Sequence, residues 1–336
     1  MVAYRGYGKT ARAVIWGHVF SKYGLKDPTE NSIVDNFRQM ARRYRLKTVE
    51  NLPLQIRILD KTFDLMTDGN GLFQAAVDMK FPAPGWYDYI VSVKGDNHQF
   101  KGSIHISDET STAVLSDIDD TLLISYVNQM LKMVWVLLVK NALTRKPVPR
   151  INLLYEAIKN FNKGAFPPDF FYVSNSEWNL YDFLLDFMQT NNIPDGVFFL
   201  QRLKTGFWAM VKAGKKLNDH KYQSILSLFQ FFDRKNFILV GDSGQRDLAI
   251  DSTVAETFAD RIKGVIIREL PKPQYRRKNK IYEDKLWQTI SDKFNVPLVE
   301  NRMQKLNVSL DEKRVVLLSK MNEMSNKTVN MLADSK

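Results

Sequence analysis

Apolar and polar residues alternate with a period of two along much of the first third of the chain. The turn-forming residues 68–71, 82–85 and 95–97 divide this stretch into short segments. The segments are rich in β-branched and aromatic residues, and they lie at residues 13–20, 54–59, 72–79, 85–94 and 99–106. A period of two is typical of strands with one buried face, and several short strands at this spacing favour a β-sandwich. We therefore predict a smaller, β-sandwich-like N-terminal domain over residues 1–110.

One insert in this domain follows the period of a helix instead. Ile33, Phe37 and Tyr44 share one helical face, and the arginines of the segment lie elsewhere on its surface. An amphipathic helix that packs on the sheet is the simpler interpretation. The alternative is that its arginines contact a membrane surface or a partner.

After residue 110 the pattern changes to apolar runs that alternate with helical segments. Near-continuous apolar runs lie at residues 112–116, 170–174, 197–200, 236–240 and 265–267. Such runs are typical of strands buried on both faces, as in a parallel sheet. Residues 177–190 and 221–232 between them have the period of a helix. We therefore predict an α/β domain over residues 111–270, with a Rossmann-like, doubly wound parallel sheet and a site at the carboxyl ends of its strands.

The last part of the chain, residues 271–336, is polar and lysine-rich. It opens on the basic segment PKPQYRRKNK, which we interpret as an exposed linker, with contact to anionic lipid as the alternative. Residues 287–294 and 311–324 have helical patterns. We predict a helical and partly flexible tail.

The composition bears on disulfides, metal sites, signal peptides and membrane-spanning helices. The 336 residues include no cysteine, which excludes disulfides and thiolate metal sites, and the four histidines have no metal-ligand spacing. The basic N-terminus has no sustained apolar run, so we expect no signal peptide. The longest apolar cluster, residues 130–139, is far shorter than the roughly 20 residues of a spanning helix. We expect a cytoplasmic protein, with peripheral membrane association as a further option.

The net charge of +11 indicates an anionic partner. Charge alone does not choose among phosphorylated substrates, lipid headgroups and nucleic acid.

Residues 113–121, AVLSDIDDT, place carboxylates directly after an apolar run. Asp117 and Asp119 are one residue apart, and like charges oppose each other's ionisation unless a cation lies between them. A strand that delivers both carboxylates to its carboxyl end therefore indicates a Mg²⁺ site at the edge of a parallel sheet. The alternative for this stretch alone is an acidic, solvated turn.

The ends of two other predicted strands also carry polar groups. Ser174 follows the second strand, and Asp242 and Asp247 follow the fourth. Lys221 opens the helix that precedes the fourth strand. Each of these residues has a simple structural explanation by itself, as a cap, a turn residue or a solvated charge. Their joint placement at successive strand ends favours a site that binds a metal and a phosphoryl group.

Four motifs in this order resemble the haloacid-dehalogenase superfamily of aspartate-based phosphatases. They are DxDxT at residues 117–121, Ser174, Lys221 and GDxxxxD ending at Asp247. The phrases SDIDDT, FFYVSNSEWNLYDFL and FILVGDSGQRD further resemble the phosphatidate phosphatase family of the actin-patch-protein type. The resemblance covers residues 111–270, and in that family the catalytic domain also follows an unrelated N-terminal region.

The resemblance implies a role for each motif. Asp117 would be the nucleophile, and Asp119 would protonate the leaving oxygen and then activate water. Ser174 and Lys221 would bind the transferring oxygens. Lys215 and Lys216 are rival candidates for the role of Lys221, which we prefer because it begins the helix before the fourth strand.

The same resemblance implies a Mg²⁺ ion. Its ligands would be the carboxylates of Asp117 and Asp242 and the backbone carbonyl of Asp119, with water completing the octahedron. Asp247 would orient the metal shell or Lys221 rather than coordinate directly.

Several segments have a composition that suits a lipid substrate. Residues 126–143 form an unusually apolar predicted helix, which is either buried core or a lid or membrane-docking face. Residues 145–150 are basic, and residues 203–217 mix aromatic residues with lysines, which suits a bilayer interface and also single-stranded nucleic acid.

We therefore expect a Mg²⁺-dependent phosphatase that converts phosphatidate to diacylglycerol at a membrane surface, in contact with anionic lipid. The alternatives are a phosphatase for a soluble phosphate ester or a polynucleotide end, and a non-catalytic phospholipid-binding module. Nucleic acid is the less favoured partner, and the sequence names no protein partner. The presence of both Asp117 and Asp119 argues against the non-catalytic module.

Overall fold

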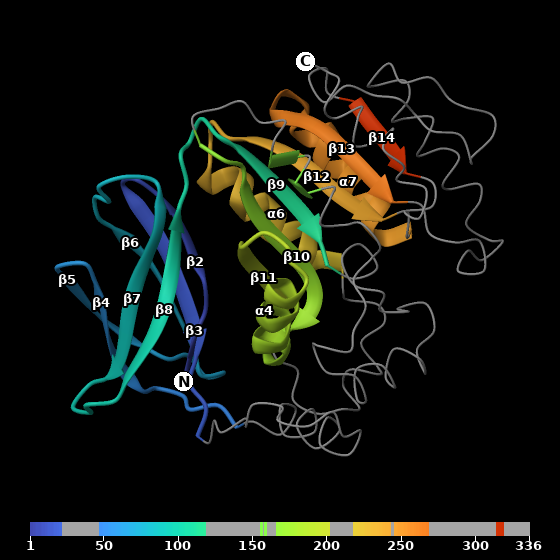
Figure 1. The fold of residues 1–336 in the computed structure, drawn as a ribbon. Helices are drawn as coiled ribbons and strands as arrows, with labels where there is room; N and C mark the ends of the chain where they lie inside the picture. Colours follow the sequence, from blue (N-terminus) through green and yellow to red (C-terminus); the bar gives the residue numbers. More distant parts are fainter. Residues whose placement is uncertain are drawn as a thin grey trace. The chain divides into compact units, whose positions relative to one another are not determined.

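The computed structural model describes residues 1–21, 47–118, 155–156, 158–159, 166–201, 218–242, 245–268 and 314–318. At residues 218–219, 242, 245–249, 252, 268 and 314–318 it describes the backbone only. The chain divides into two compact units, Met1–Glu109 and a second that begins at Thr110 (Figure 1). The change in hydrophobic pattern near residue 110 coincides with this division.

The first unit is built on one mixed β-sheet. Its strands are β1 (Val2–Ala3), β2 (Gly6–Lys9), β3 (Arg12–His18), β4 (Pro53–Ile58), β5 (Lys61–Met66), β6 (Leu72–Asp78), β7 (Gly85–Val93) and β8 (Gln99–Ile106). The sheet order is β1-β3-β2-β8-β7-β4-β5, and β6 pairs with β3. All of these pairs are antiparallel except that of β2 with β8. The predicted β-rich unit is therefore present, but its strands are hydrogen-bonded into one sheet and not into the two sheets of a sandwich.

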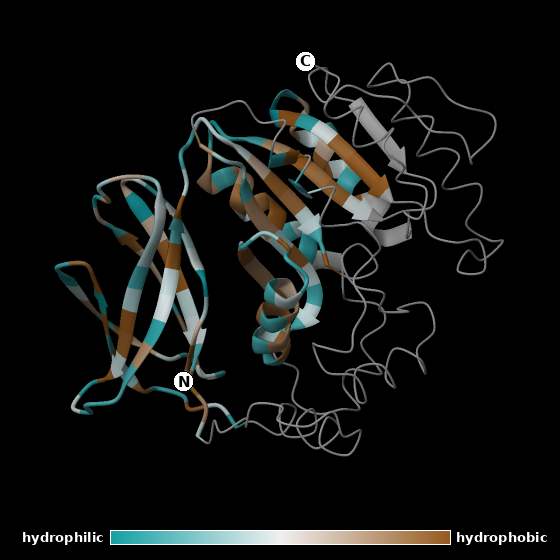
Figure 2. Cartoon of the chain, viewed as in Figure 1, coloured by the Kyte–Doolittle hydropathy of each residue, from teal (hydrophilic) through white to brown (hydrophobic). Residues whose placement is uncertain are grey.

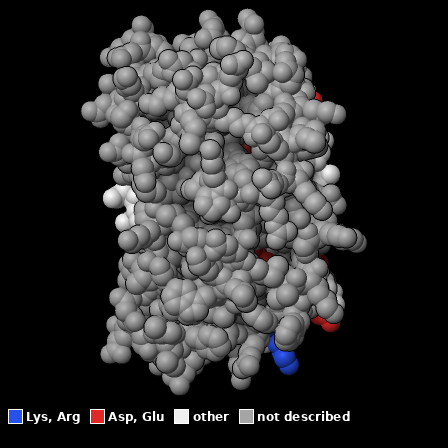
Figure 3. Space-filling view, turned by 90° about the vertical axis from the view of Figure 1, so that its right-hand side faces the viewer, with Lys and Arg blue, Asp and Glu red and all other residues white. Residues whose placement is uncertain are grey.

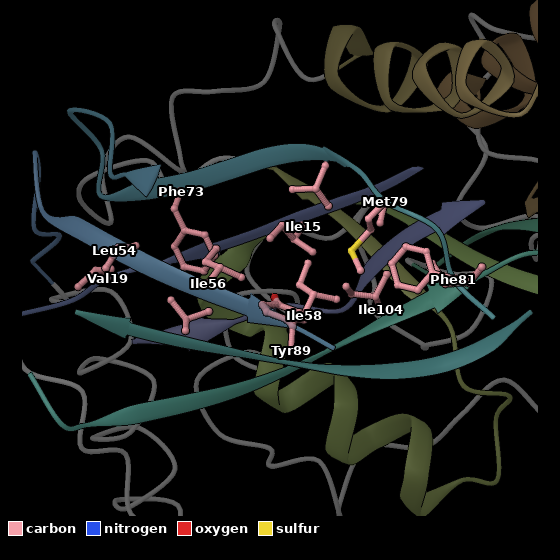
Figure 4. Packing of buried hydrophobic residues seen from close by; sticks show 14 residues of the cluster. Ile15, Val19, Leu54, Ile56, Ile58, Phe73, Met79, Phe81, Tyr89 and Ile104 are labelled. Carbon is pink, nitrogen blue, oxygen red and sulfur yellow. The ribbon is translucent and has the colours of Figure 1, made fainter. Parts of the chain in front are cut away.

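Alternate residues of these strands form the core of the first unit. In β4, Leu54, Ile56 and Ile58 are fully buried, whereas the residues between them are exposed. Phe73 from β6 and Tyr89 from β7 point into the same interior (Figure 4). The sheet thus curves around its own core, which explains the period of two without a second sheet.

The second unit contains an all-parallel sheet. Its strands are β9 (Thr112–Asp117), β10 (Asp169–Glu177), β11 (Val197–Gln201), β12 (Asn236–Asp242), β13 (Ile262–Arg268) and β14 (Arg314–Leu318). The spatial order is β11-β10-β9-β12-β13-β14, with every neighbouring pair parallel. The strand order therefore reverses at the β9–β12 pair. In open parallel sheets, ligands bind outside the carboxyl ends of the strands at such a reversal.

The helices of this unit follow the predicted pattern, with shifted ends. In the described part of this unit they are α4 (Tyr181–Thr190), α6 (Asn218–Phe231) and α7 (Gln245–Thr257), with the 3₁₀ turns η1 (Trp178–Leu180) and η2 (Ala259–Arg261). Residues 155–156 and 158–159 are also helical. The α-helix predicted from residue 177 begins later because η1 precedes it, and α7 was not predicted. Strands β12 and β13 are hydrophobic along most of their length (Figure 2), as expected for a sheet covered on both faces.

The prediction of a helix over residues 311–324 is wrong at its centre, where β14 pairs in parallel with β13. The segment RVVLL is rich in β-branched residues, and the edge of β13 offers unpaired backbone groups to it. The parallel sheet therefore includes a strand beyond residue 270. The helices predicted at 33–44, 126–143 and 287–294 lie outside the described residues.

A buried ion pair joins the amino ends of three neighbouring strands. Lys235, just before β12, lies 2.5 Å from the Oδ2 of Asp169 at the start of β10. Ser111, just before β9, donates to Asp169 Oδ2 at 3.0 Å and accepts from Lys235 Nζ at 2.7 Å. Lys235 is 0% exposed and Asp169 is 6% exposed. This Lys235–Asp169–Ser111 cluster lies at the edge opposite the carboxyl ends, so we assign it to folding stability.

In the part of the chain that the structure describes, none of the helices has the length and apolar character needed to cross a membrane.

Candidate active site

Asp117 and Lys221 form a buried ion pair at the carboxyl end of β9. The Nζ of Lys221 lies 3.1 Å from the Oδ1 of Asp117, and the two residues are 6% (Asp117) and 2% (Lys221) exposed. A buried carboxylate is costly unless a cation is paired with it. The pair therefore supplies an anionic carboxylate with a cation beside it, at the strand end where the sequence predicted a nucleophile.

The strand register brings three predicted positions to one edge of the sheet. Asp117 is paired with Val173 of β10, so Ser174 lies one residue beyond it on the neighbouring strand. On the other side of β9, Ser116 is paired with Val240, so Asp242 ends β12 at the same edge. The backbone alone thus places these residues around the point at which the strand order reverses.

Ser174 lies in the last part of β10, where the strand is irregular. The register between β10 and β11 shifts between Val173 and Glu177. The Ser174 side chain is fully buried, and its hydroxyl accepts a hydrogen bond from the backbone N–H of Ser176 at 2.8 Å. This bond fixes the hydroxyl oxygen at the strand end, in place of the helix cap that was the simpler alternative.

Lys221 lies within the first turn of α6 and does not open it, because the helix begins at Asn218. From this first turn, the Lys221 side chain reaches the Asp117 carboxylate. The rival candidates Lys215 and Lys216 lie outside the described residues, so the preference for Lys221 over them stays a prediction.

The metal-binding prediction is covered only in part by the described residues. Asp119 lies outside them, and only the backbone is described at Asp242 and at Asp247 in the first turn of α7. Among the side chains that are described, no three histidine or acidic groups are close enough to hold a metal ion. The residue types nevertheless fit Mg²⁺, because the backbone places Asp117 and Asp242 at the ends of adjacent strands, and Mg²⁺ prefers carboxylate oxygens.

Sequence reasoning missed a buried carboxylate, Asp251 of α7, which packs against β12. A Cβ built on Gly241 would collide with the Oδ2 of Asp251, at a separation closer than real contacts allow. Asp251 is 6% exposed. A side chain at position 241, just before Asp242, would therefore force the buried Asp251 carboxylate to move. Because Asp251 is nine residues after Asp242 in an unpredicted helix, its position could not be found from the motif.

We expect Gly241→Ala to destabilise the second unit by about 1–3 kcal/mol, the usual cost of overpacking a buried site. Urea denaturation measures this change, and phosphate release should fall with it because Asp242 follows directly. In the background of Asp251→Ala, the clashing carboxylate is absent and the same substitution should cost less. An equal cost in both backgrounds contradicts the assignment.

The segments predicted to contact a membrane, at residues 126–143, 145–150, 203–217 and 271–280, lie outside the described residues. On the face shown in Figure 3, the described residues carry both acidic and basic side chains. Contact with anionic lipid therefore stays a prediction.

Comparison with known proteins gives a family match and two curated relatives. Residues 112–269 match the family model described as the catalytic domain of phosphatidate phosphatase APP1. The chain is 36% identical over 100 residues to phosphatidate phosphatase APP1 of Saccharomyces cerevisiae, which covers 30% of this chain and 16% of that protein. It is 23% identical over 172 residues to an uncharacterised protein of Schizosaccharomyces pombe, which covers 51% of this chain and 27% of that protein. The chain thus spans less than a third of the length of these relatives.

Among solved structures, a carbohydrate acetylesterase from Xanthomonas citri is similar over 78% of this chain and 66% of its own, with a TM-score of 0.30 and 12% identity. A likeness at this level carries no argument about fold or function.

Proposed function

We propose that this chain, whose residues 112–269 match the family model described as the catalytic domain of phosphatidate phosphatase APP1, is a phosphatase that hydrolyses phosphatidate to diacylglycerol and phosphate. One structural observation carries the proposal beyond the family match. The buried Asp117–Lys221 pair lies at the carboxyl ends of the parallel strands, beside the reversal of strand order. A carboxylate held next to a cation in this position suits attack on a phosphoryl group.

The strand order supports a Rossmann-like fold of the haloacid-dehalogenase type. Counted along the chain from β9, the order is 3-2-1-4-5-6, which is the order of the doubly wound nucleotide-binding sheets. The proposed nucleophile, Asp117, is the last residue of the first strand in this count, at the centre of the sheet.

In the proposed reaction, a carboxylate oxygen of Asp117 attacks phosphorus and forms an aspartyl-phosphate, while the bond to the diacylglycerol oxygen breaks. Asp119 donates a proton to that leaving oxygen. In the second step Asp119 takes a proton from water, whose oxygen attacks phosphorus and releases phosphate and the Asp117 carboxylate. Lys221 and Ser174 stabilise the negative charge on the phosphoryl oxygens in both steps.

Mg²⁺ is part of this proposal. The carboxylates of Asp117 and Asp242 and the backbone carbonyl of Asp119 would hold the ion, and Asp247 would orient its surroundings. When bound, the ion offsets the charge between the nucleophile and the phosphoryl oxygens.

Removal of the metal should abolish phosphate release. We expect chelation with EDTA to reduce the release of phosphate from phosphatidate to the level without enzyme, and added Mg²⁺ to restore it. The measurement compares phosphatidate in mixed vesicles with soluble phosphate esters and a 3′-phosphorylated oligonucleotide, each with and without Mg²⁺. Equal rates of phosphate release before and after chelation would contradict the metal assignment.

The same screen tests the substrate. Faster turnover of a soluble ester or of the oligonucleotide would overturn the phosphatidate assignment and leave the reaction class intact. Binding to anionic vesicles without release of phosphate from any of these compounds would instead identify a non-catalytic lipid-binding protein. Cosedimentation with phosphatidate vesicles measures that binding and also tests peripheral association with a membrane.

A further inference from the structure

A chain of two buried hydrogen bonds ends on the backbone of the nucleophile. The hydroxyl of Ser116 donates to the carbonyl oxygen of Asp117 at 2.8 Å. The same hydroxyl lies 2.6 Å from the hydroxyl of Tyr155. A serine hydroxyl has one proton to donate. Either hydroxyl can donate in the contact between Ser116 and Tyr155, and both contacts are satisfied when Tyr155 donates to Ser116 and Ser116 donates to Asp117. We adopt this direction, in which the hydrogen bonds run from Tyr155 through Ser116 to Asp117.

Tyr155 is held in one position by aromatic packing. It is fully buried, and its ring lies at right angles to those of Phe170 and Tyr172 of β10, with centroids 5.5 Å and 6.4 Å away. Ser116 is also buried. A hydroxyl in such surroundings is costly unless it is hydrogen-bonded, so burial specifies the contact between Tyr155 and Ser116.

The charge state of Tyr155 is consistent with a permanent donor. Burial raises the pKa of its hydroxyl well above the ordinary value of 10, and the negative charge of Asp117 raises it further. Because the folded-state pKa is raised, Tyr155 keeps its proton at every pH below its ordinary value. The hydrogen-bond chain therefore stays intact over the pH range of a phosphatase assay.

These two hydrogen bonds lie where β9 leaves the sheet. The pairing of β9 with β12 ends at Ser116 and Val240, and its pairing with β10 ends at Asp117 and Val173. The peptide that follows Asp117 thus lies at the end of both ladders. A donor on the Asp117 carbonyl oxygen restrains the plane of the peptide between Asp117 and Ile118.

We infer that Tyr155 is a positioning residue for the nucleophile, acting through Ser116 on the backbone of Asp117. The inference rests on the proposed phosphatase function for its kinetic consequence but not for its geometry. Tyr155 touches neither the reacting carboxylate nor the phosphoryl group in this assignment. Its removal should impair the alignment of Asp117 for attack and leave substrate binding largely unchanged.

Tyr155→Phe removes the first donor and keeps the ring. We expect kcat for phosphate release to fall about tenfold with little change in KM, since small misplacements of reacting groups slow the chemical step. Ser116→Ala should lower kcat at least as much. The double variant should be no slower than Ser116→Ala alone, because the two hydroxyls act in series.

Tyr172→Phe is the matched control. Tyr172 is also a buried residue of this aromatic cluster, but its hydroxyl donates to the carbonyl oxygen of Pro194 at 2.7 Å and not toward Asp117. The control should lose stability to a similar degree and keep the kcat of the unchanged protein. Equal losses of kcat in Tyr155→Phe and Tyr172→Phe would show a merely structural role and overturn the inference.

A measurement without catalysis separates this inference from the proposed function. In protein labelled with ¹³C at aspartate carbonyl carbons, the resonance of Asp117 is identified by its loss in Asp117→Asn. We expect it to shift in Tyr155→Phe and Ser116→Ala and to stay in place in Tyr172→Phe. An unmoved resonance in Tyr155→Phe overturns the inference even if the protein is a phosphatase. A shifted resonance in a protein that releases no phosphate supports the hydrogen-bond chain and rejects the proposed function.

Discussion

Asp117→Asn is expected to reduce the release of phosphate by at least about 10⁴-fold, which is the scale of effect when a nucleophile is removed. The amide that replaces the carboxylate cannot form the aspartyl-phosphate. The structure adds a second consequence, because Lys221 lies 3.1 Å from Asp117 and is buried. The substitution takes this anion away from a buried ammonium group, so some loss of stability should accompany the loss of activity.

Asp117→Glu separates the two effects. Glutamate keeps the negative charge beside Lys221 but displaces the carboxylate by one methylene. We expect stability closer to that of the unchanged protein and activity as low as in Asp117→Asn, measured as initial rates of phosphate release and as urea midpoints. Full activity in Asp117→Asn would refute the nucleophile assignment.

Lys235→Met is expected to destabilise the second unit by about 3–5 kcal/mol, which is typical when one partner of a buried ion pair is removed. The substitution takes the ammonium group away from the buried Asp169 carboxylate, to which the Ser111 hydroxyl still donates. Urea denaturation measures the free energy, and hydrogen exchange of peptides from β12 identifies the affected unit.

Two further variants test the cause. Lys235→Met with Asp169→Leu removes both charges, so it should recover much of the lost stability. Lys159→Met breaks a partly exposed pair with Glu156 in the same unit and should change little. A double variant as unstable as the single one would point to packing, and not to the uncompensated charge, as the origin of the loss.

The sequence predicted most strands well because each has a simple burial pattern. In β8, the predicted residues and the observed bounds coincide, since the hydrophobic alternation begins and ends with the strand. Strand β14 was missed because a short apolar segment in a polar tail becomes a strand only when a sheet edge is present to pair with it.

The strand pairing of the first unit was harder to predict from the sequence. Alternation in β4 and β7 specifies which side chains face inward, but it does not specify which strands pair. Strands β2 and β8 pair in parallel although almost a hundred residues separate them in the sequence. This pairing joins the strands into one mixed sheet, whereas their alternation alone suggested a sandwich. Strand pairing over such distances depends on the whole chain.

The sequence by itself determined the kinds of group that the site contains and the strand ends that carry them. Asp117, Ser174 and Asp242 each follow an apolar run, and parallel strands bring their carboxyl ends to one edge. Only the tertiary structure decided which groups touch. It placed Lys221 on Asp117, Asp251 against Gly241 and Tyr155 on Ser116. Most of these contacts join residues far apart in the chain, and all of them arise from helix packing and burial, which no local pattern of residues encodes.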